Sequence, residues 1–199
     1  MTKNEFRAYV KDKFRSMGFE SHKSIHYKFI EDDYVVCLEL DPSSYCKGYQ
    51  CTWGAIILPN EDTFPPCGRY DVSANFQFPR EPGDELDFSL PVLERHVKYD
   101  YKCEYEKYTR EQIERYFDAN IAQFITPLYD IELALDYFRN DWRRFRYNKP
   151  EHIVNICKKA GLNPQQVFSS IGKDHIEAVC KRSGRNAREV LETLGITLY

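Results

Sequence analysis

The sequence predicts an α+β protein: an N-terminal helix, an antiparallel meander of four or five strands, two long helices, and a small all-α module of two helical-hairpin repeats. Three observations predict this. Two capping-box patterns, one near residue 2 and one near residue 109, each precede a run with the apolar spacing of an amphipathic helix. Alternating apolar and polar runs lie between those helices. The C-terminal residues repeat at a constant offset of 23. We expect an α+β domain at 1–147 and a four-helix module at 148–199.

The first helix is expected at residues 3–17. Thr2-x-x-Glu5 has the capping-box pattern, and apolar residues follow at helical spacing. Gly18 is expected to end the helix, with Phe19 packing back on it.

Strands are expected next. Residues 26–30 and 34–40 form a predicted hairpin, and residues 49–58 a third strand with Gly54 as a candidate bulge. Two further runs, 70–78 and 97–105, alternate apolar and polar side chains and indicate half-buried antiparallel strands.

Two helices follow the predicted sheet. Thr109-x-x-Gln112 is a second capping box. Thr126 and Pro127 have the pattern of an N-cap and first-turn proline, which predicts that the next helix starts there. Residues 147–150 are the expected linker.

The C-terminal residues form two similar units, 152–172 and 175–195. Eight positions are identical, namely His152/His175, Ile153/Ile176, Cys157/Cys180, Lys158/Lys181, Gly161/Gly184, Asn163/Asn186, Val167/Val190 and Gly172/Gly195. The first glycine of each unit is expected to end one helix, and the asparagine to begin the next with a capping box. Each unit therefore predicts a helical hairpin, and two hairpins bury their apolar faces against each other.

Charge is distributed unevenly along the chain. Residues 139–199 carry twelve Lys or Arg and six Asp or Glu, a net charge of +6. The other residues carry 16 basic and 25 acidic side chains, a net charge of −9. No apolar run reaches the ~20 residues that span a bilayer, and no apolar signal region is present. We expect a cytoplasmic protein with no membrane partner. An odd number of cysteines, seven, favours reduced thiols.

No sequence pattern identifies an active site. The phosphate-loop, dinucleotide-binding, nucleophile-elbow and zinc-protease motifs are absent. His22 and His26 have metal-ligand spacing, but exposed histidines are the better interpretation because a helix does not connect them. The cysteines are interpreted as scattered core thiols. We therefore expect no cofactor and no metal, and lean against an enzyme.

Two sets of basic residues are candidate binding sites. The segment after the last long helix combines arginines with aromatic residues, a composition typical of protein-binding hot spots, which predicts partner contacts by Arg143, Arg144, Arg146 and Tyr147. The repeats carry a second set that would suit nucleic-acid phosphates, namely Lys158, Lys159, Lys181, Arg182, Arg185 and Arg188.

Other motifs lie within residues 5–80. Gly18-Phe19 follows the first helix, Ser43-Ser44 follows the hairpin, and Gly54 lies in an aromatic strand. This pattern resembles a family of bacterial proteins known only as a domain of unknown function. Glu39-Leu40-Asp41 replaces the family's Gln-containing region, and Thr52-Trp53-Gly54 replaces its Asn-x-Gly triplet. The resemblance implies an α+β fold and a bacterial or phage setting. The family has no established activity, so no functional residue is implied.

The leading functional hypothesis is a non-catalytic protein-binding protein, of the immunity, inhibitor or adaptor kind. Its acidic body would attract a basic protein. One alternative is nucleic-acid binding through the basic C-terminal repeats. A second alternative is an enzyme with an unrecognised site on the sheet.

Overall fold

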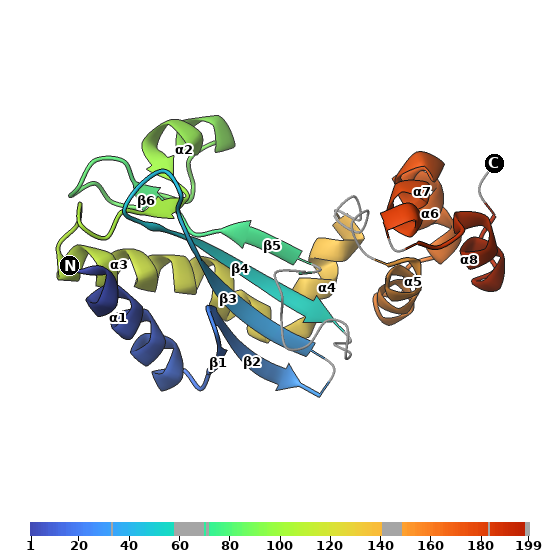
Figure 1. Ribbon diagram of the computed structural model, residues 1–199, viewed down its shortest axis with the longest axis horizontal. Helices are drawn as coiled ribbons and strands as arrows, with labels where there is room; N and C mark the ends of the chain where they lie inside the picture. The colour runs from blue at the N-terminus through green and yellow to red at the C-terminus, as the bar shows by residue number, and fades with distance from the viewer. Residues whose placement is uncertain (33, 58–69, 71, 141–148, 183, 198–199) are drawn as a thin grey trace. The chain divides into compact units, whose positions relative to one another are not determined.

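A computed structural model describes residues 1–32, 34–57, 70, 72–140, 149–182 and 184–197 (Figure 1). The chain divides into two compact units, Met1–Tyr129 and Asp130–Tyr199. The architecture is α+β, as the sequence predicts. The predicted domain boundary after residue 147 lies outside the described residues and stays a prediction.

Helix α1, Lys3–Ser16, begins and ends as expected. Thr2 accepts a hydrogen bond from the Glu5 amide at 3.3 Å, and the Glu5 carboxylate accepts one from the Thr2 amide at 2.6 Å. Gly18 adopts a φ of +84°, and the Phe19 amide donates to the Phe14 carbonyl at 2.9 Å. This Schellman motif turns the chain back so that the Phe14 and Phe19 rings pack edge to face.

The main sheet is an antiparallel meander, and every neighbouring pair is antiparallel. Its strands in spatial order are β1 (Glu20–His22), β2 (Ile25–Glu31), β3 (Tyr34–Pro42), β4 (Tyr49–Ile57) and β5 (Val72–Asn75). A short strand, β8 (Lys102–Cys103), also pairs with β4. The central strands β3 and β4 are buried on both faces, so buried and exposed side chains do not alternate regularly along either strand.

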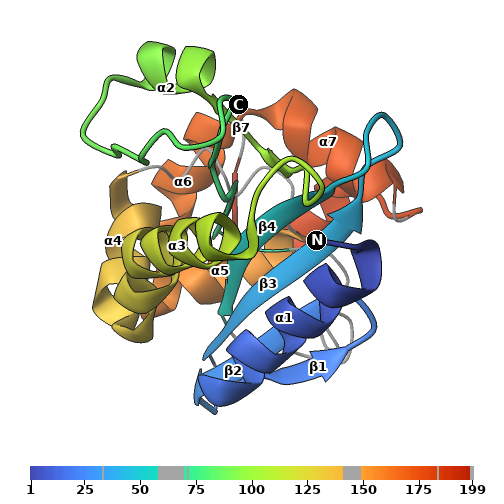
Figure 2. The same ribbon diagram turned by 90° about the vertical axis from the view of Figure 1, so that its left-hand side faces the viewer.

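Helices α1 and α3 (Arg110–Asn120) lie over the same face of the sheet (Figure 2). Aromatic side chains make this interface. The Phe6 ring stacks on Tyr49 at 5.4 Å, and the Phe14 ring stacks on His26 at 5.6 Å. On the opposite face of the sheet, a smaller apolar cluster comprises Ile25, Val35, Cys37 and Ile56, with Tyr27 and Tyr70 packed against it.

Gly54 is not a bulge. It pairs in regular register with Cys37 on β3 and with Ser73 on β5. The reason for a glycine is the ring of Tyr70, which lies so close that a Cβ at position 54 would overlap it. The Tyr70 hydroxyl then reaches Glu39 at 2.9 Å.

The two predicted outer strands are shorter than expected. Residues 70–78 divide into β5 and β6 (Phe78–Pro79), and β6 pairs with β7 (Tyr99–Asp100) in a separate two-stranded sheet. The predicted strand 97–105 is wrong at its start, because residues Val92–Lys98 form helix α2. The alternating pattern there belongs to a helix end followed by two separate two-residue strands, β7 and β8.

Helix α3 has the predicted capping box at Thr109 and Gln112. It continues through a π-helical turn, Ile121–Ile125, and a 3-10 turn, Thr126–Tyr129. The expected N-cap at Thr126 is therefore wrong. Helix α4 begins at Ile131, where the Asp130 carboxylate accepts a hydrogen bond from the Glu132 amide at 2.9 Å. Pro127 lies within the 3-10 turn, so the N-cap of α4 is Asp130, one turn further along the chain.

The second unit contains α4 (Ile131–Asn140) and four helices in the two predicted hairpins. These are α5 (Pro150–Lys159), α6 (Pro164–Ile171), α7 (Lys173–Arg182) and α8 (Ala187–Thr193). Equivalent bonds recur at the offset of 23. The Leu162 amide donates to the Cys157 carbonyl at 2.8 Å, and the Arg185 amide donates to the Cys180 carbonyl at 3.0 Å. Repeated sequence therefore produces repeated backbone geometry.

The caps of α6 and α8 differ from the expected capping boxes. The Asn163 side chain accepts from the Gln165 amide at 2.9 Å, and Asn186 accepts from the Arg188 amide at 3.0 Å. Both bonds reach the second helical residue instead of the third. No side-chain bond returns to either asparagine backbone amide in the described residues, so each asparagine caps its helix alone and neither capping box forms.

Candidate partner-binding surface

The segment between β6 and β7, residues 80–98, contains a helix that contributes nothing to the core. Helix α2 has no buried residue. Its aliphatic side chains are exposed instead, with 81% of Leu93, 74% of Val97 and 58% of Val92 accessible to solvent. Figure 1 shows α2 standing apart from α1, α3 and the main sheet. An apolar cluster displayed in this way is typical of a site that another molecule covers.

Hydrogen bonds fix both ends of this segment to the body. The Arg80 amide donates to the Lys98 carbonyl at 2.9 Å, which continues the β6–β7 pairing. The Tyr99 hydroxyl accepts from the Asp87 amide at 2.7 Å and donates to the Glu85 carbonyl at 3.2 Å. The loop before α2 is therefore held in place although α2 itself buries no residue.

An aromatic stack anchors the middle of the loop. The Phe88 ring meets Phe124 at 5.2 Å, and Phe124 stacks on Trp53 at 5.5 Å. Trp53 is in the central strand β4 and is 4% exposed. The loop that leads into α2 is thus connected to the sheet core through two ring contacts.

The loop that precedes α2 is rich in acidic side chains. The loop of residues 81–91 carries four carboxylates and no basic residue, namely Glu81, Asp84, Glu85 and Asp87, all exposed. Helix α2 adds Glu94, Arg95 and Lys98, so residues 81–98 have a net charge of −3. The segment of residues 81–98 therefore combines exposed aliphatic side chains with a net negative charge.

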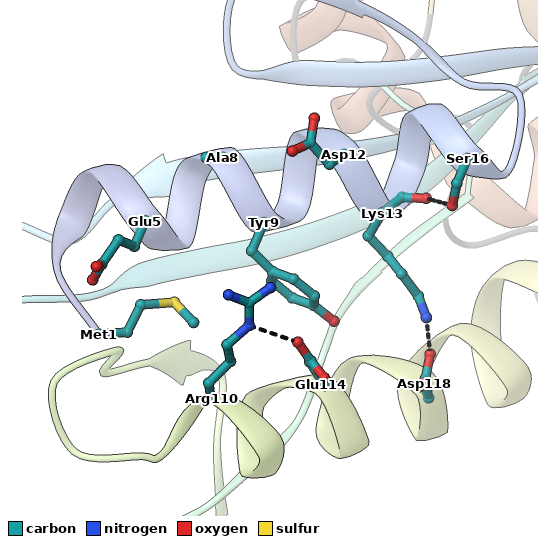
Figure 3. Close-up of a pocket in the computed structure, with 10 residues that line it drawn as sticks. All are labelled: Met1, Glu5, Ala8, Tyr9, Asp12, Lys13, Ser16, Arg110, Glu114 and Asp118. Atoms are coloured by element: carbon teal, nitrogen blue, oxygen red, sulfur yellow. Dashed lines mark hydrogen bonds and ion pairs between the residues drawn. The ribbon is translucent and has the colours of Figure 1, made fainter.

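A groove of about 690 Å³ lies between α1 and α3 (Figure 3). Ion pairs cross or border it. Lys13 of α1 pairs with Asp118 of α3, and Arg110 bonds Glu114 at 2.9 Å. Glu5 is used in the α1 cap. Because these charges are already matched within the protein, the groove has the properties of a structural seam between two helices.

Tyr9 is the exception in this seam. Its ring packs edge to face on Phe117 at 5.6 Å, and its hydroxyl is buried with no hydrogen-bond partner among the described residues. Burial raises the pKa of Tyr9, and the carboxylates of Asp118 and Glu114 raise it further. Tyr9 therefore stays a neutral phenol and is unsuited to act as a base.

On the other face of the sheet, the Tyr70 hydroxyl donates a hydrogen bond to the Glu39 carboxylate. Among the described residues, Glu39 is the one carboxyl group whose pKa is raised. Burial raises the pKa of Glu39, and the hydrogen bond from Tyr70 opposes that rise. Beside them, the Asn75 carbonyl accepts from Gln50 at 3.0 Å and from Thr52 at 2.9 Å. These groups satisfy one another, and we assign no reaction to them.

The basic residues of the repeats separate into two groups. Arg185 pairs with Glu151, and Arg188 bonds Glu192 at 2.8 Å, so both are used within the module. Lys158 and Lys181 are exposed at equivalent positions in the last turns of α5 and α7. Lys159 and Arg182 follow them, half-buried and exposed respectively. The structure therefore places a basic pair at the end of each of the two equivalent helices, where the helix dipole also favours cations.

The other expected sites have mixed outcomes. Arg143, Arg144, Arg146 and Tyr147 lie outside the described residues, so their role in partner binding stays a prediction. The expectation of exposed histidines is wrong for His26, which is 4% exposed and bonds Ser21 at 2.9 Å. It packs on Phe14 because β2 directs it toward α1.

In the described ranges, no three His, Cys, Asp or Glu side chains group in a way that could hold a metal ion. No helix in the same ranges is long and apolar enough to cross a bilayer.

The chain matches no protein-family profile, no curated protein and no solved structure. The resemblance of residues 5–80 to a bacterial family therefore stays a prediction.

Sequence reasoning missed the α2 surface. Residues 97–105 alternate so regularly that a strand was expected, and residues 92–98 were not recognised as a helix. A usable signal was present, because Pro91 precedes an aliphatic pair, Leu93 and Val97, at a spacing of four. The pattern is too short to outweigh the alternation that overlaps it.

Proposed function

We propose that this is a non-catalytic protein-binding protein, of the immunity, inhibitor or adaptor kind, that captures a basic protein through its acidic N-terminal unit. The observation that carries the proposal is α2, which buries no residue yet holds three of the exposed large aliphatic side chains. A helix retained without any core contact is better explained by an external partner than by stability. A bacterial or phage origin rests on the family resemblance alone.

Electrostatics supports a basic partner. Residues 1–129 contain 16 basic and 22 acidic side chains, a net charge of −6, and the exposed loop before α2 is uniformly acidic. Complementary potentials accelerate encounter and suppress partners of like charge. The proposal therefore includes a dependence on salt, since exposed charges are screened over about 10 Å at 0.1 M ionic strength.

The chemistry of the α1–α3 groove also supports a non-catalytic role. The charged groups of the α1–α3 groove are paired with each other, and Tyr9 has a pKa that burial raises. A general base needs a pKa close to the working pH and a free path to its substrate. Tyr9 does not meet the first of these requirements, because its raised pKa keeps it a neutral phenol.

The proposal is tested by affinity capture from the native host with the tagged full-length protein, with and without nuclease treatment. We expect a stoichiometric protein partner that survives nuclease. Recovery of nucleic acid alone, or of no stoichiometric protein, would contradict the proposal.

Nucleic-acid binding through the repeats is a second candidate, favoured by the equivalent positions of Lys158 and Lys181. Phosphate contacts make affinity fall steeply with salt. The double variant Lys158→Gln/Lys181→Gln would then weaken binding to duplex and single-stranded probes and reduce the salt slope by about 2. Equal binding by the wild type and this variant would remove the candidate.

A further inference from the structure

Helix α2 depends on its anchors rather than on its own stability. Its seven residues are far fewer than the ~12 that an isolated helix needs in water. The Tyr101 hydroxyl bonds His96 at 2.5 Å, and Arg80 donates to the His96 carbonyl at 3.3 Å. These bonds hold the helix from its C-terminal side. The protein therefore maintains a helical conformation that its own core does not use.

The exposed aliphatic groups share one region of that helix. Leu93 and Val97 are four residues apart, so they lie on the same face, and Val92 is next to Leu93. Preorganisation of such a stripe lowers the entropy cost that a partner would otherwise bear on binding. A stripe of two aliphatic anchors one turn apart is the pattern by which a short helix enters an apolar groove.

The charge around α2 indicates which kind of molecule binds its exposed face. If two copies met through α2, Asp84 and Glu94 of one copy would approach the same acidic surface of the other, which is unfavourable. A partner with an apolar groove and a basic rim satisfies both the aliphatic stripe and the net charge of −3 over residues 81–98.

We infer that α2 docks as a preformed short helix into an apolar groove on the partner protein, with Leu93 and Val97 as anchors and basic groups of the partner around the acidic loop. This inference rests on the proposed function and adds to it the element and the binding mode. The ring contacts of Phe88 with Phe124, and of Phe124 with Trp53, then anchor the loop that leads into the docking helix.

The first test places a photo-crosslinking amino acid in the full-length chain, at Leu93 in one sample and at Asp84 in another, with Leu133 of α4 as a control. Leu133 is also exposed, at 45%, but lies in the other unit. Crosslinks from positions 93 and 84 to one basic protein, and none from 133, support the inference. A crosslink from 84 without one from 93 overturns the inference but leaves the proposed function intact. Crosslinks from neither position contradict both.

The second test compares Leu93→Asp/Val97→Asp with Leu133→Asp in capture of the crosslinked protein. The α2 variant should reduce capture at least tenfold, while the control retains it. Because Leu93 and Val97 pack on nothing, both proteins should unfold at the same temperature as the wild type. Undiminished capture by the α2 variant overturns the inference.

Discussion

Asn120 is fully buried, and its side chain closes three hydrogen bonds at the end of α3. Its amide donates to the carbonyls of Gln77 and Tyr116 at 2.8 and 2.7 Å, and its carbonyl accepts from the Gln77 amide at 2.8 Å. It therefore satisfies the backbone where the chain passes from β5 to β6, just before the segment that carries α2.

We predict that Asn120→Ala lowers the free energy of unfolding by about 2–3 kcal/mol, because both backbone groups of Gln77 lose buried partners. Urea denaturation followed by circular dichroism measures this. Asn4→Ala, at an exposed position of α1, is the control and should change stability by less than about 0.5 kcal/mol. Equal stability of both variants would show that water replaces the Asn120 bonds.

His26 introduces a pH dependence. Burial, together with the nearby charge of Lys11, lowers its pKa to about 4. Because the pKa in the unfolded chain is about 6.5, the folded state binds the proton less well. The neutral histidine therefore contributes stability above about pH 6.5, and this contribution is lost as pH falls toward about 4.

We predict that the free energy of unfolding falls by on the order of 3 kcal/mol through His26 between about pH 7 and pH 4. Denaturation curves at several pH values measure the slope. His26→Gln should be less stable than the wild type at neutral pH but should show a shallower slope in this window. A variant with an unchanged slope would assign the acid sensitivity to other groups.

At the scale of elements, the two repeats use the same glycine turns. Gly161 and Gly184 have φ angles of +65° and +67°, and neither has a neighbouring atom within 4 Å of an added Cβ. A side chain there is disfavoured by the backbone alone.

We therefore predict that Gly161→Ala and Gly184→Ala destabilise the second unit by equal amounts, about 1 kcal/mol each. Ser170→Ala, at an exposed position of α6, is the matched control. Thermal unfolding of the full-length variants measures the losses. Clearly unequal losses would contradict the structural equivalence of the two hairpins.

Elements with local signals could be predicted from sequence. The capping boxes at Thr2 and Thr109 and the glycine ends of the repeats are short-range patterns, and each forms where it was expected. Local patterns also failed, at the expected N-cap of Thr126 and at the capping boxes of Asn163 and Asn186. The strand that was predicted wrongly depends on tertiary context. Alternation in residues 97–105 does not distinguish one long strand from α2 followed by β7 and β8, since the choice depends on pairing with β6 and β4.

The candidate site was less predictable than the fold. An exposed aliphatic pair such as Leu93 and Val97 has the same sequence signature as a buried one, and only the three-dimensional arrangement shows that nothing covers it. The role of Gly54 is similar, because its need for space arises from Tyr70, sixteen residues further along the chain.

At the scale of the whole molecule, charge is the feature that connects sequence to proposed function. The unit of residues 1–129 has a net charge of −6, and residues 130–199 have a net charge of +3. If the acidic unit captures a basic protein, binding has to weaken when salt screens the carboxylates near α2. Ion pairs within the unit, such as Lys13–Asp118, do not contact the partner in this proposal, so they do not contribute to the salt dependence of binding.

The most direct measurement is the affinity of the captured protein for purified full-length wild type and for Asp84→Lys/Glu94→Lys, at about 0.1 M and about 1 M salt. Glu31→Lys/Asp32→Lys is the matched control, since it makes the same charge change at the β2–β3 turn, at the other end of the unit (Figures 1 and 2). We predict wild-type and control affinities that fall at least tenfold with salt, and a weaker, less salt-dependent affinity for Asp84→Lys/Glu94→Lys. Affinities that do not change with salt concentration and are equal for the two variants would contradict capture of a basic protein by the surface around α2.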